Sequence, residues 1–350
     1  MKINISELQL NESCTGGELL ISKAEVRKTK TGKDYLDMTL TDGRSTINGK
    51  MWDANTIPTA PVVSLDFSVT TFNGTLQLNI SACAPSQLPV TDFAPNRGYD
   101  LDYAEESLRE YFRDVDASFQ DFANELFFAR IKEIRQTTAA IGMHHVQAGG
   151  LLQHTYEVVK YTSELVCLCN ILQSRMQQGP CIDLAVTGAL LHDIGKLETY
   201  TCNPNNAQFE MSFTGRLSEH LVTGIVMLRN SYAASIHPNI AKQLEHIIAA
   251  HHGKLEYGSP VVPVTLEAYL VSVADDLSAK LDSAFKLLGE APESAEFTSK
   301  LPTFGRELLT PTAVYHHIAL ELQGHPAIRQ PIHNVVPPEY LSTTEEGVSL

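Results

Sequence analysis

The chain has 350 residues, of which 43% are hydrophobic and 19% charged, and its net charge is −15 at pH 7. This length favours two domains, and this balance excludes a wholly disordered chain. The acidic charge argues against avid binding of long duplex DNA, since the surfaces that bind nucleic acid are usually basic. Residues 1–90 are nearly neutral, however, with eight Lys and Arg against nine Asp and Glu. That part could contact a nucleic-acid strand locally.

The sequence indicates a cytoplasmic protein without a membrane partner. The N-terminus, MKINISELQL, lacks a basic segment followed by an apolar stretch, and no apolar run is long enough to cross a bilayer. No CxxC pattern is present, which is typical of reduced thiols. The six cysteines are Cys14, Cys83, Cys167, Cys169, Cys181 and Cys202. The sequence leaves the oligomeric state open.

Residues 1–88 are predicted to form β structure. Short runs of β-branched and apolar residues alternate with turn signals such as Asp42-Gly43 and Asn73-Gly74, which favour tight hairpins. Five strands in so short a segment suit a closed barrel of the OB-fold type. The expected strands are Gly17–Val26, Asp34–Thr41, Ser45–Trp52, Val62–Thr71 and Thr75–Ser81.

The rest of the chain is predicted to be helical. Residues 89–100 are rich in Pro and Gly and are predicted to be a linker. From residue 101 apolar residues recur at helical spacing, as in the stripe Leu217, Leu221, Ile225 and Leu228. Residues 101–290 are therefore predicted to form an all-α bundle, with a short β excursion at 199–213, and residues 291–350 a partly mobile C-terminal extension. The predicted fold class is multidomain α+β.

Histidines on the expected helices are the most informative feature. A single imidazole on a core-facing stripe is usually a core residue with satisfied hydrogen bonds. Several imidazoles and carboxylates together favour a metal site, because without a metal they would be costly buried polar groups. This ligand set suits Mn, Fe, Co, Ni or Zn, and the lack of nearby Cys argues against structural zinc. The residues concerned are His154, His220 and His251, with the pairs His192-Asp193 and His251-His252.

The segment 191–196, Leu-His-Asp-Ile-Gly-Lys, resembles the signature after which the HD phosphohydrolases are named. The order His154, His192-Asp193, His220, His251-His252, Asp275 is similar to the order of ligands in bimetallic HD enzymes. Over about residues 5–290 the chain resembles the bacterial 3′→5′ exoribonucleases that join an OB domain to an HD domain. The narrower likeness rests on segments 144–155, 191–196, 251–253, 258–260 and 274–280.

The resemblance implies a helical HD domain that binds one or two divalent metals, Mn²⁺ first, with Fe, Co, Ni, Zn or Mg as alternatives. The first metal would be held by His154, His192, Asp193 and Asp275, and the second, bridged by Asp193, by His220, His251 and His252. Asp193 and Lys196 would be catalytic, with a metal-activated water as nucleophile. Lys196 would contact phosphate or stabilise the transition state, although a solvated Lys at a helix end is the plain alternative.

Three residues depart from the family pattern as we expect it. Gln153 stands in place of Glu, Glu219 in place of Gly, and Asp276 in place of Asn. None of these changes removes an expected ligand. Glu219, beside His220, could alter substrate fit or the hydrogen bonds around the ligands.

Several further residues are candidates for substrate binding. His144 and His145 could contact the scissile phosphate or be ordinary loop residues, and Arg216 could bind phosphate or pair with a Glu. In the barrel, aromatic side chains could stack on bases or simply pack, and a basic loop could touch the backbone of the strand. The aromatic candidates are Tyr35, Trp52, Phe67 and Phe72, with Trp52 favoured beside Lys50, and the loop residues are Lys28, Lys30 and Lys33. The histidines expected to be non-ligands are His237, His246, His316, His317, His325 and His333.

The leading hypothesis is a metal-dependent phosphodiesterase that acts as a 3′→5′ exoribonuclease on single-stranded RNA, with single-stranded DNA as a second substrate. One alternative keeps the HD phosphohydrolase but gives it a small nucleotide or cyclic dinucleotide, which the acidic charge favours and the barrel disfavours. Another is a non-catalytic RNA-binding module with a structural metal, against which the intact ligand set argues.

Overall fold

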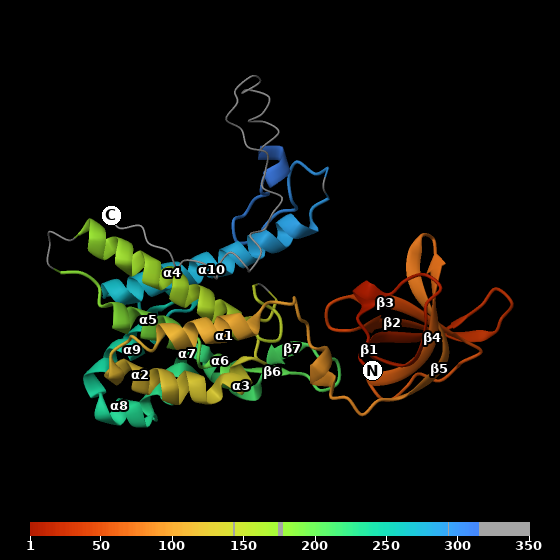
Figure 1. Cartoon of the computed structure of the whole chain (residues 1–350), viewed down its shortest axis with the longest axis horizontal. Helices are drawn as coiled ribbons and strands as arrows, with labels where there is room; N and C mark the ends of the chain where they lie inside the picture. Colours follow the sequence, from red (N-terminus) through yellow and green to blue (C-terminus); the bar gives the residue numbers. More distant parts are fainter. Residues whose placement is uncertain (143, 174–177, 293, 315–350) are drawn as a thin grey trace, which may run out of the picture. The chain divides into compact units, whose positions relative to one another are not determined.

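The computed structural model describes residues 1–142, 144–173, 178–292 and 294–314. The chain divides into two compact units, residues 1–279 and 280–350. The first unit holds a β-barrel and a set of helices (Figure 1). Its last residue, 279, falls within the sequence of helix α10 (Leu266–Glu290). The predicted domain limits at residues 88, 100 and 290 stay predictions.

The barrel has the five predicted strands, closed in the order β1-β2-β3-β5-β4. They are β1 (Ser13–Lys28), β2 (Asp34–Thr41), β3 (Thr46–Trp52), β4 (Val62–Phe72) and β5 (Thr75–Pro85). Neighbouring strands are antiparallel except β3 and β5, which are parallel. The OB-type barrel is thereby confirmed. β1 is longer than predicted because its first half pairs with β4 and its second half with β2.

The barrel interior decides between the two alternatives for Phe67. Inward-facing residues alternate along β4, and Leu65, Phe67 and Val69 are all buried in the barrel core. Phe67 is 3% exposed. Of the two alternatives for Phe67, packing therefore holds and base stacking does not, because the two-residue period of the strand turns its ring inward.

The helical region is built around a large apolar core that includes Leu152, Val158, Leu190, Ile247 and Val271. The excursion predicted at 199–213 is a two-stranded antiparallel hairpin, β6 (Tyr200–Cys202) and β7 (Phe209–Met211). The helices before α10 are α1 (Leu101–Tyr111), α2 (Ala117–Phe122), α3 (Ile131–Ile134), α4 (Gly150–Leu172), α5 (Ile182–Leu191), α6 (Lys196–Thr199), α7 (Phe213–Arg229), α8 (Tyr232–Ile236) and α9 (Pro238–Ala250).

A kink in α7 removes Leu217 from the predicted apolar stripe. Glu219 has φ 55° and ψ 164°, so the helix is interrupted there. The residues on its two sides no longer follow one helical spacing. Leu217 is 71% exposed, whereas Leu221 and Leu228 are buried. Leu217 is therefore not a core residue, contrary to the prediction.

The second unit contains the end of α10 and two isolated antiparallel bridges, Phe297 with Leu309 and Leu301 with Arg306. Most of the predicted C-terminal extension lies outside the described residues, as do His316, His317, His325 and His333. Among the helices that the structure describes, none has the length and apolar character needed to span a bilayer.

Candidate metal centre

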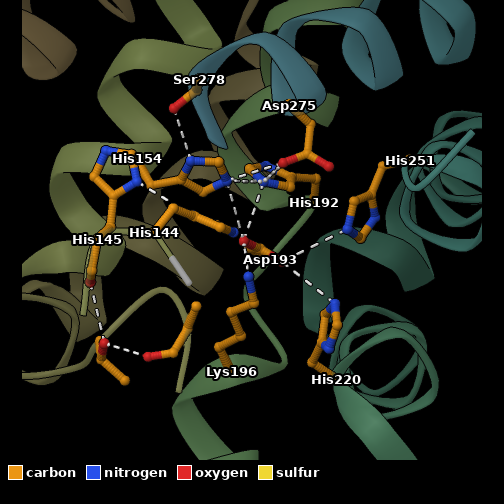
Figure 2. A network of polar contacts seen from close by, with 12 residues as sticks. His144, His145, His154, His192, Asp193, Lys196, His220, His251, Asp275 and Ser278 are labelled. Atoms are coloured by element: carbon orange, nitrogen blue, oxygen red, sulfur yellow. Dashed lines mark hydrogen bonds and ion pairs between the residues drawn. The ribbon is translucent and has the colours of Figure 1, made fainter. Parts of the chain in front are cut away.

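The predicted ligands come together from five separate helices or helix ends (Figure 2). Three of the groups formed have ligand atoms that all lie within 4.8 Å of one another. The first is His154, His192 and Asp275, the second is His192, Asp193 and His251, and the third is His220, His251 and His252. His154 lies on α4 and Asp275 on α10, and His192 and His251 cap the carboxyl ends of α5 and α9.

Four of the five histidines share one hydrogen-bond pattern. Each Nδ1 lies next to an oxygen, so the Nδ1–H is the donor and Nε2 keeps its lone pair for a metal. At the ends of α5 and α9 the acceptors are carbonyls of the last turn, which have no partner within the helix. The acceptors are Ala189 O for His192 (2.7 Å), Ile248 O for His251 (2.8 Å), Tyr257 O for His252 (2.9 Å) and Ser278 Oγ for His154 (2.9 Å).

Asp193 lies at the middle of the cluster, and its two oxygens face different histidines (Figure 2). Its Oδ2 is 3.2 Å from His192 Nε2 and 3.4 Å from His154 Nε2. Its Oδ1 is 3.5 Å from His220 Nε2 and 3.6 Å from His251 Nε2, and this buried atom has no hydrogen-bond partner among the described residues. A carboxylate between two imidazole groups, with one unsatisfied oxygen, fits divalent metal binding.

Lys196 is not a solvated surface residue. Its side chain is buried, and Nζ lies 2.5 Å from Asp193 Oδ2. Gly195 makes this turn fit, because a Cβ there would lie 2.0 Å from the carbonyl oxygen of His220. The HDIGK segment therefore packs against α7 so closely that only glycine is tolerated, and this contact sets Lys196 beside the central carboxylate.

Charges within the cluster decide which groups are ionised. Burial would raise the pKa of Asp193, but the charges of Lys196 and His192 outweigh it and hold that pKa well below its usual range. Burial would likewise lower the pKa of Lys196, which Asp193 instead raises. Desolvation lowers the pKa of His154 and His220. Burial would also lower the pKa of His192, but the charge of Asp193 outweighs it and raises that pKa. The cluster therefore holds a charged Asp–Lys pair, and burial favours at His154 and His220 the neutral form that a metal ligand needs.

Glu157 and Ser278 support His154, and the sequence interpretation missed both. Ser278 Oγ accepts from His154 and donates to Glu157 Oε2 at 2.7 Å. The other oxygen of Glu157 accepts from Gln153 Nε2 at 2.8 Å. His145 is buried with its Nε2 3.2 Å from Glu157 Oε2. Glu157 lies three residues after His154, on the same helix face, and that spacing was the available signal.

We predict that Ser278→Ala lowers the affinity for Mn²⁺ by about 10- to 100-fold, because His154 loses the acceptor that orients its ring. Isothermal titration of metal-free protein with Mn²⁺ measures this loss. Ser272→Ala is the matched control, since Ser272 Oγ on the same helix donates only to the carbonyl of Tyr269 at 2.7 Å. Equal Mn²⁺ affinities in the two variants would contradict the prediction.

Other predicted residues lie around this cluster or away from it. His144 borders it, with Nδ1 3.2 Å from His145 Nδ1, and burial lowers the pKa of His144 to about 4. Arg216 is exposed and forms no ion pair within the described part of the chain. His237 pairs with Asp121 at 2.9 Å, and His246 accepts from the Val264 amide at 3.0 Å. Among the described residues, neither of these two belongs to the histidine groups.

In the barrel, Lys50 lies among three aromatic rings. Its Nζ is 5.7 Å from the ring centre of Tyr35, 5.9 Å from that of Trp52 and 4.7 Å from that of Phe72. Trp52 and Phe72 are 48% and 57% exposed. Lys50 and Phe72 also line a groove of about 360 Å³. Of the loop lysines, Lys28 pairs with Asp34 (2.8 Å) and Lys33 with Asp53 (3.3 Å), and Lys30 is exposed.

Comparison with known proteins agrees with this site. The HD domain family matches residues 151–280. Residues 151–280 are an HD domain. This stretch contains His154, the HDIGK segment, the later histidines and Asp275, so each expected ligand lies inside the match.

Curated relatives match over most of the chain. The 3′-5′ exoribonuclease YhaM of Oceanobacillus iheyensis is 28% identical, with 81% of this chain and 90% of the relative covered. The proteins of the same name from Halalkalibacterium halodurans and Bacillus subtilis are each 26% identical, with 81% of this chain and 88% and 90% of the relatives covered. The second OB-fold domain of replication protein A from Methanococcus maripaludis is 19% identical and has a TM-score of 0.21, with 25% of this chain and 97% of that domain covered. The HD domain and the three exoribonuclease relatives support a hydrolase of the HD superfamily.

Proposed function

We propose that this HD protein is a metal-dependent 3′→5′ exoribonuclease that degrades single-stranded RNA and also accepts single-stranded DNA. The observation that carries the proposal is Asp193, whose two oxygens each face a different pair of imidazole Nε2 atoms. Such a carboxylate suits a two-metal phosphodiesterase. The curated relatives are named 3′-5′ exoribonucleases, which supports this polarity and substrate class. Manganese as the metal and the cytoplasm as the location remain part of the proposal.

The clustered residues would have separate roles at the scissile phosphate. His154, His192, Asp193 and Asp275 would hold one divalent ion, and Asp193 with His220, His251 and His252 a second. Bound there, the metal would supply Lewis acidity and activate a water nucleophile. Asp193 lies between the two sites, with one carboxylate oxygen facing the histidines of each. Lys196 keeps a positive charge in a buried place, where it would stabilise the charge that develops on phosphate oxygens. His144, at the edge of the cluster, would contact the strand end.

The barrel would capture the strand. Tyr35, Trp52 and Phe72 offer faces for base stacking, and Lys50 between them offers a charge for the backbone. The ring centres of Tyr35 and Trp52 lie 5.0 Å apart, and the Trp52 Nε1–H donates to Asn79 Oδ1 at 2.9 Å. These contacts hold the indole ring in place while leaving it accessible to a base.

We predict that Trp52→Ala weakens binding of single-stranded RNA by about 1–3 kcal/mol, roughly 5- to 150-fold in Kd, because a stacked base loses its partner. Fluorescence anisotropy of a labelled oligonucleotide measures the Kd, with Tyr232→Ala, an exposed aromatic residue on α8, as control. Trp52 is the only Trp in the chain. Its fluorescence should therefore be quenched as RNA binds the wild-type protein. A Kd unchanged by Trp52→Ala would refute the stacking role.

The proposed activity is tested with 5′-labelled single-stranded RNA and Mn²⁺, with a chelator and Asp193→Ala as separate controls. We expect a ladder that shortens from the 3′ end and is absent from both controls. Full-length RNA after incubation with protein that demonstrably binds Mn²⁺ would refute the exoribonuclease. Mononucleotides and cyclic dinucleotides would then be the substrates to test next, in keeping with the acidic net charge.

A further inference from the structure

His220 is the exception among the five clustered histidines. The other four donate Nδ1–H to an oxygen, whereas the buried Nδ1 of His220 has no hydrogen-bond partner among the described residues. Its Nε2 nevertheless faces the cluster, 3.2 Å from His252 Nε2 and 3.5 Å from Asp193 Oδ1. Without an acceptor at Nδ1, no hydrogen bond at that nitrogen sets the tautomer of His220.

The residue directly before His220 has a strained backbone. Glu219 has φ 55° and ψ 164°, a combination that is essentially confined to glycine. Such a conformation in a larger residue persists only when the surroundings hold it, and it gathers at functional sites. Here the Glu219 carbonyl accepts from Thr223 Oγ1 at 2.8 Å, which fixes the start of the second half of α7.

The interrupted backbone places the Glu219 carboxylate near the next side chain, which a regular helix would not do. Side chains of consecutive residues on a helix do not face each other. At this kink, Glu219 Oε2 lies 3.9 Å from Nδ1 of the next residue, His220. The Glu219 side chain is 62% exposed, so rotation about its own bonds can close the remaining gap.

We propose that Glu219 is a positioning residue, whose carboxylate accepts the Nδ1–H of His220 and so aims Nε2 at a metal ion. This inference rests on the metal site of the proposed function. The strained backbone at Glu219 then serves to place a hydrogen-bond acceptor beside His220, the one clustered histidine whose Nδ1 otherwise has no acceptor. A carboxylate behind a ligating imidazole fixes the tautomer and raises the basicity of the ligand.

The test compares Glu219→Gly and Glu219→Gln with the wild-type full chain. Glycine removes both the strain and the acceptor, so the urea midpoint of the metal-free protein should rise. The Mn²⁺ affinity of the site that contains His220 should fall about 10- to 100-fold. Glutamine keeps the strain and an amide oxygen, so the midpoint should stay near the wild type and the affinity should fall less. Glu198→Gln, at an exposed residue of α6, is the control and should change neither quantity.

The urea midpoint and the Mn²⁺ affinity together distinguish a residue that positions His220 from one that only stabilises the fold. A residue that only stabilises the fold cannot raise stability and lower Mn²⁺ affinity in one substitution. Glu219→Gly protein that binds Mn²⁺ as tightly as the wild type would overturn the inference and leave the proposed function intact. A lower urea midpoint for Glu219→Gly would overturn the argument from strain. Wild-type protein that binds no Mn²⁺ would instead refute the metal site and, with it, the inference.

Discussion

Asp193→Ala is expected to abolish the nuclease activity, with a loss of about 10³-fold or more. Both proposed ion sites lose a ligand at once, because each oxygen of this carboxylate faces a separate pair of histidines. Lys196 loses its partner in the same step, and an uncompensated buried charge costs about 3–5 kcal/mol. Single-turnover hydrolysis of labelled RNA at saturating Mn²⁺ measures the catalytic loss, and urea unfolding of metal-free protein measures the loss of stability.

Two further variants show whether the loss comes from the site. Asp193→Asn preserves the side-chain volume but carries no charge, so it should bind Mn²⁺ weakly while keeping the core packed. Asp114→Ala removes an exposed carboxylate that follows α1 and should leave hydrolysis unchanged. Hydrolysis by Asp193→Ala at a tenth of the wild-type rate or faster would rule out the central role of this residue.

Lys196→Met is expected to lower kcat about 10²-fold, because the buried ammonium no longer stabilises charge on the phosphate. The same substitution should raise the affinity for Mn²⁺, since Nζ lies 2.5 Å from Asp193 Oδ2 and competes with a cation for that oxygen. A lower kcat together with a higher Mn²⁺ affinity is expected only if Lys196 both acts on the phosphate and pairs with Asp193. Steady-state kcat and KM on RNA, together with Mn²⁺ titration, measure both.

The alternative for Lys196 makes a different prediction. A solvated lysine that only offsets a helix dipole would contribute about 0.3–1 kcal/mol to stability and nothing to kcat. The burial of the side chain already argues against that interpretation. Lys196→Met protein with the wild-type kcat would restore it. Lys254→Met, at an exposed lysine that pairs with Glu256 at 3.6 Å, is the control.

The sequence predicts the parts of this protein that depend on local patterns. Turn signals and two-residue alternation located the five strands of the barrel, and the HDIGK segment with its spaced histidines located the cluster. A strand's period says that alternate residues share a face, but it does not say which face is inward. The sequence therefore left Phe67 open between packing and stacking. Leu217 was misassigned because helical spacing holds only while the helix is regular, and Glu219 interrupts it.

Long-range support of the ligands was beyond sequence reasoning. Ser278 and His154 are 124 residues apart in the chain, yet their side chains share a hydrogen bond. Nothing in the local pattern around Glu157 shows that its carboxylate joins α4 to α10 through Ser278. The burial of Lys196 follows from the close packing of Gly195 on α7. Such contacts depend on the packing of distant helices, which one sequence without the fold does not provide.

The ion pairs on the barrel surface bear on how salt would act on strand capture. Lys23 and Arg27 pair with Glu25, Arg27 also with Asp37, and Lys28 with Asp34. A cation that is already paired with a carboxylate displaces few counterions when it meets a nucleic acid. For single strands, each phosphate that a protein neutralises changes the slope of log K against log salt by only about −0.7. Lys50 stands apart as a cation held among aromatic rings. Ionic strength should therefore weaken capture by this barrel only slightly, and stacking rather than charge would set how long the strand is held.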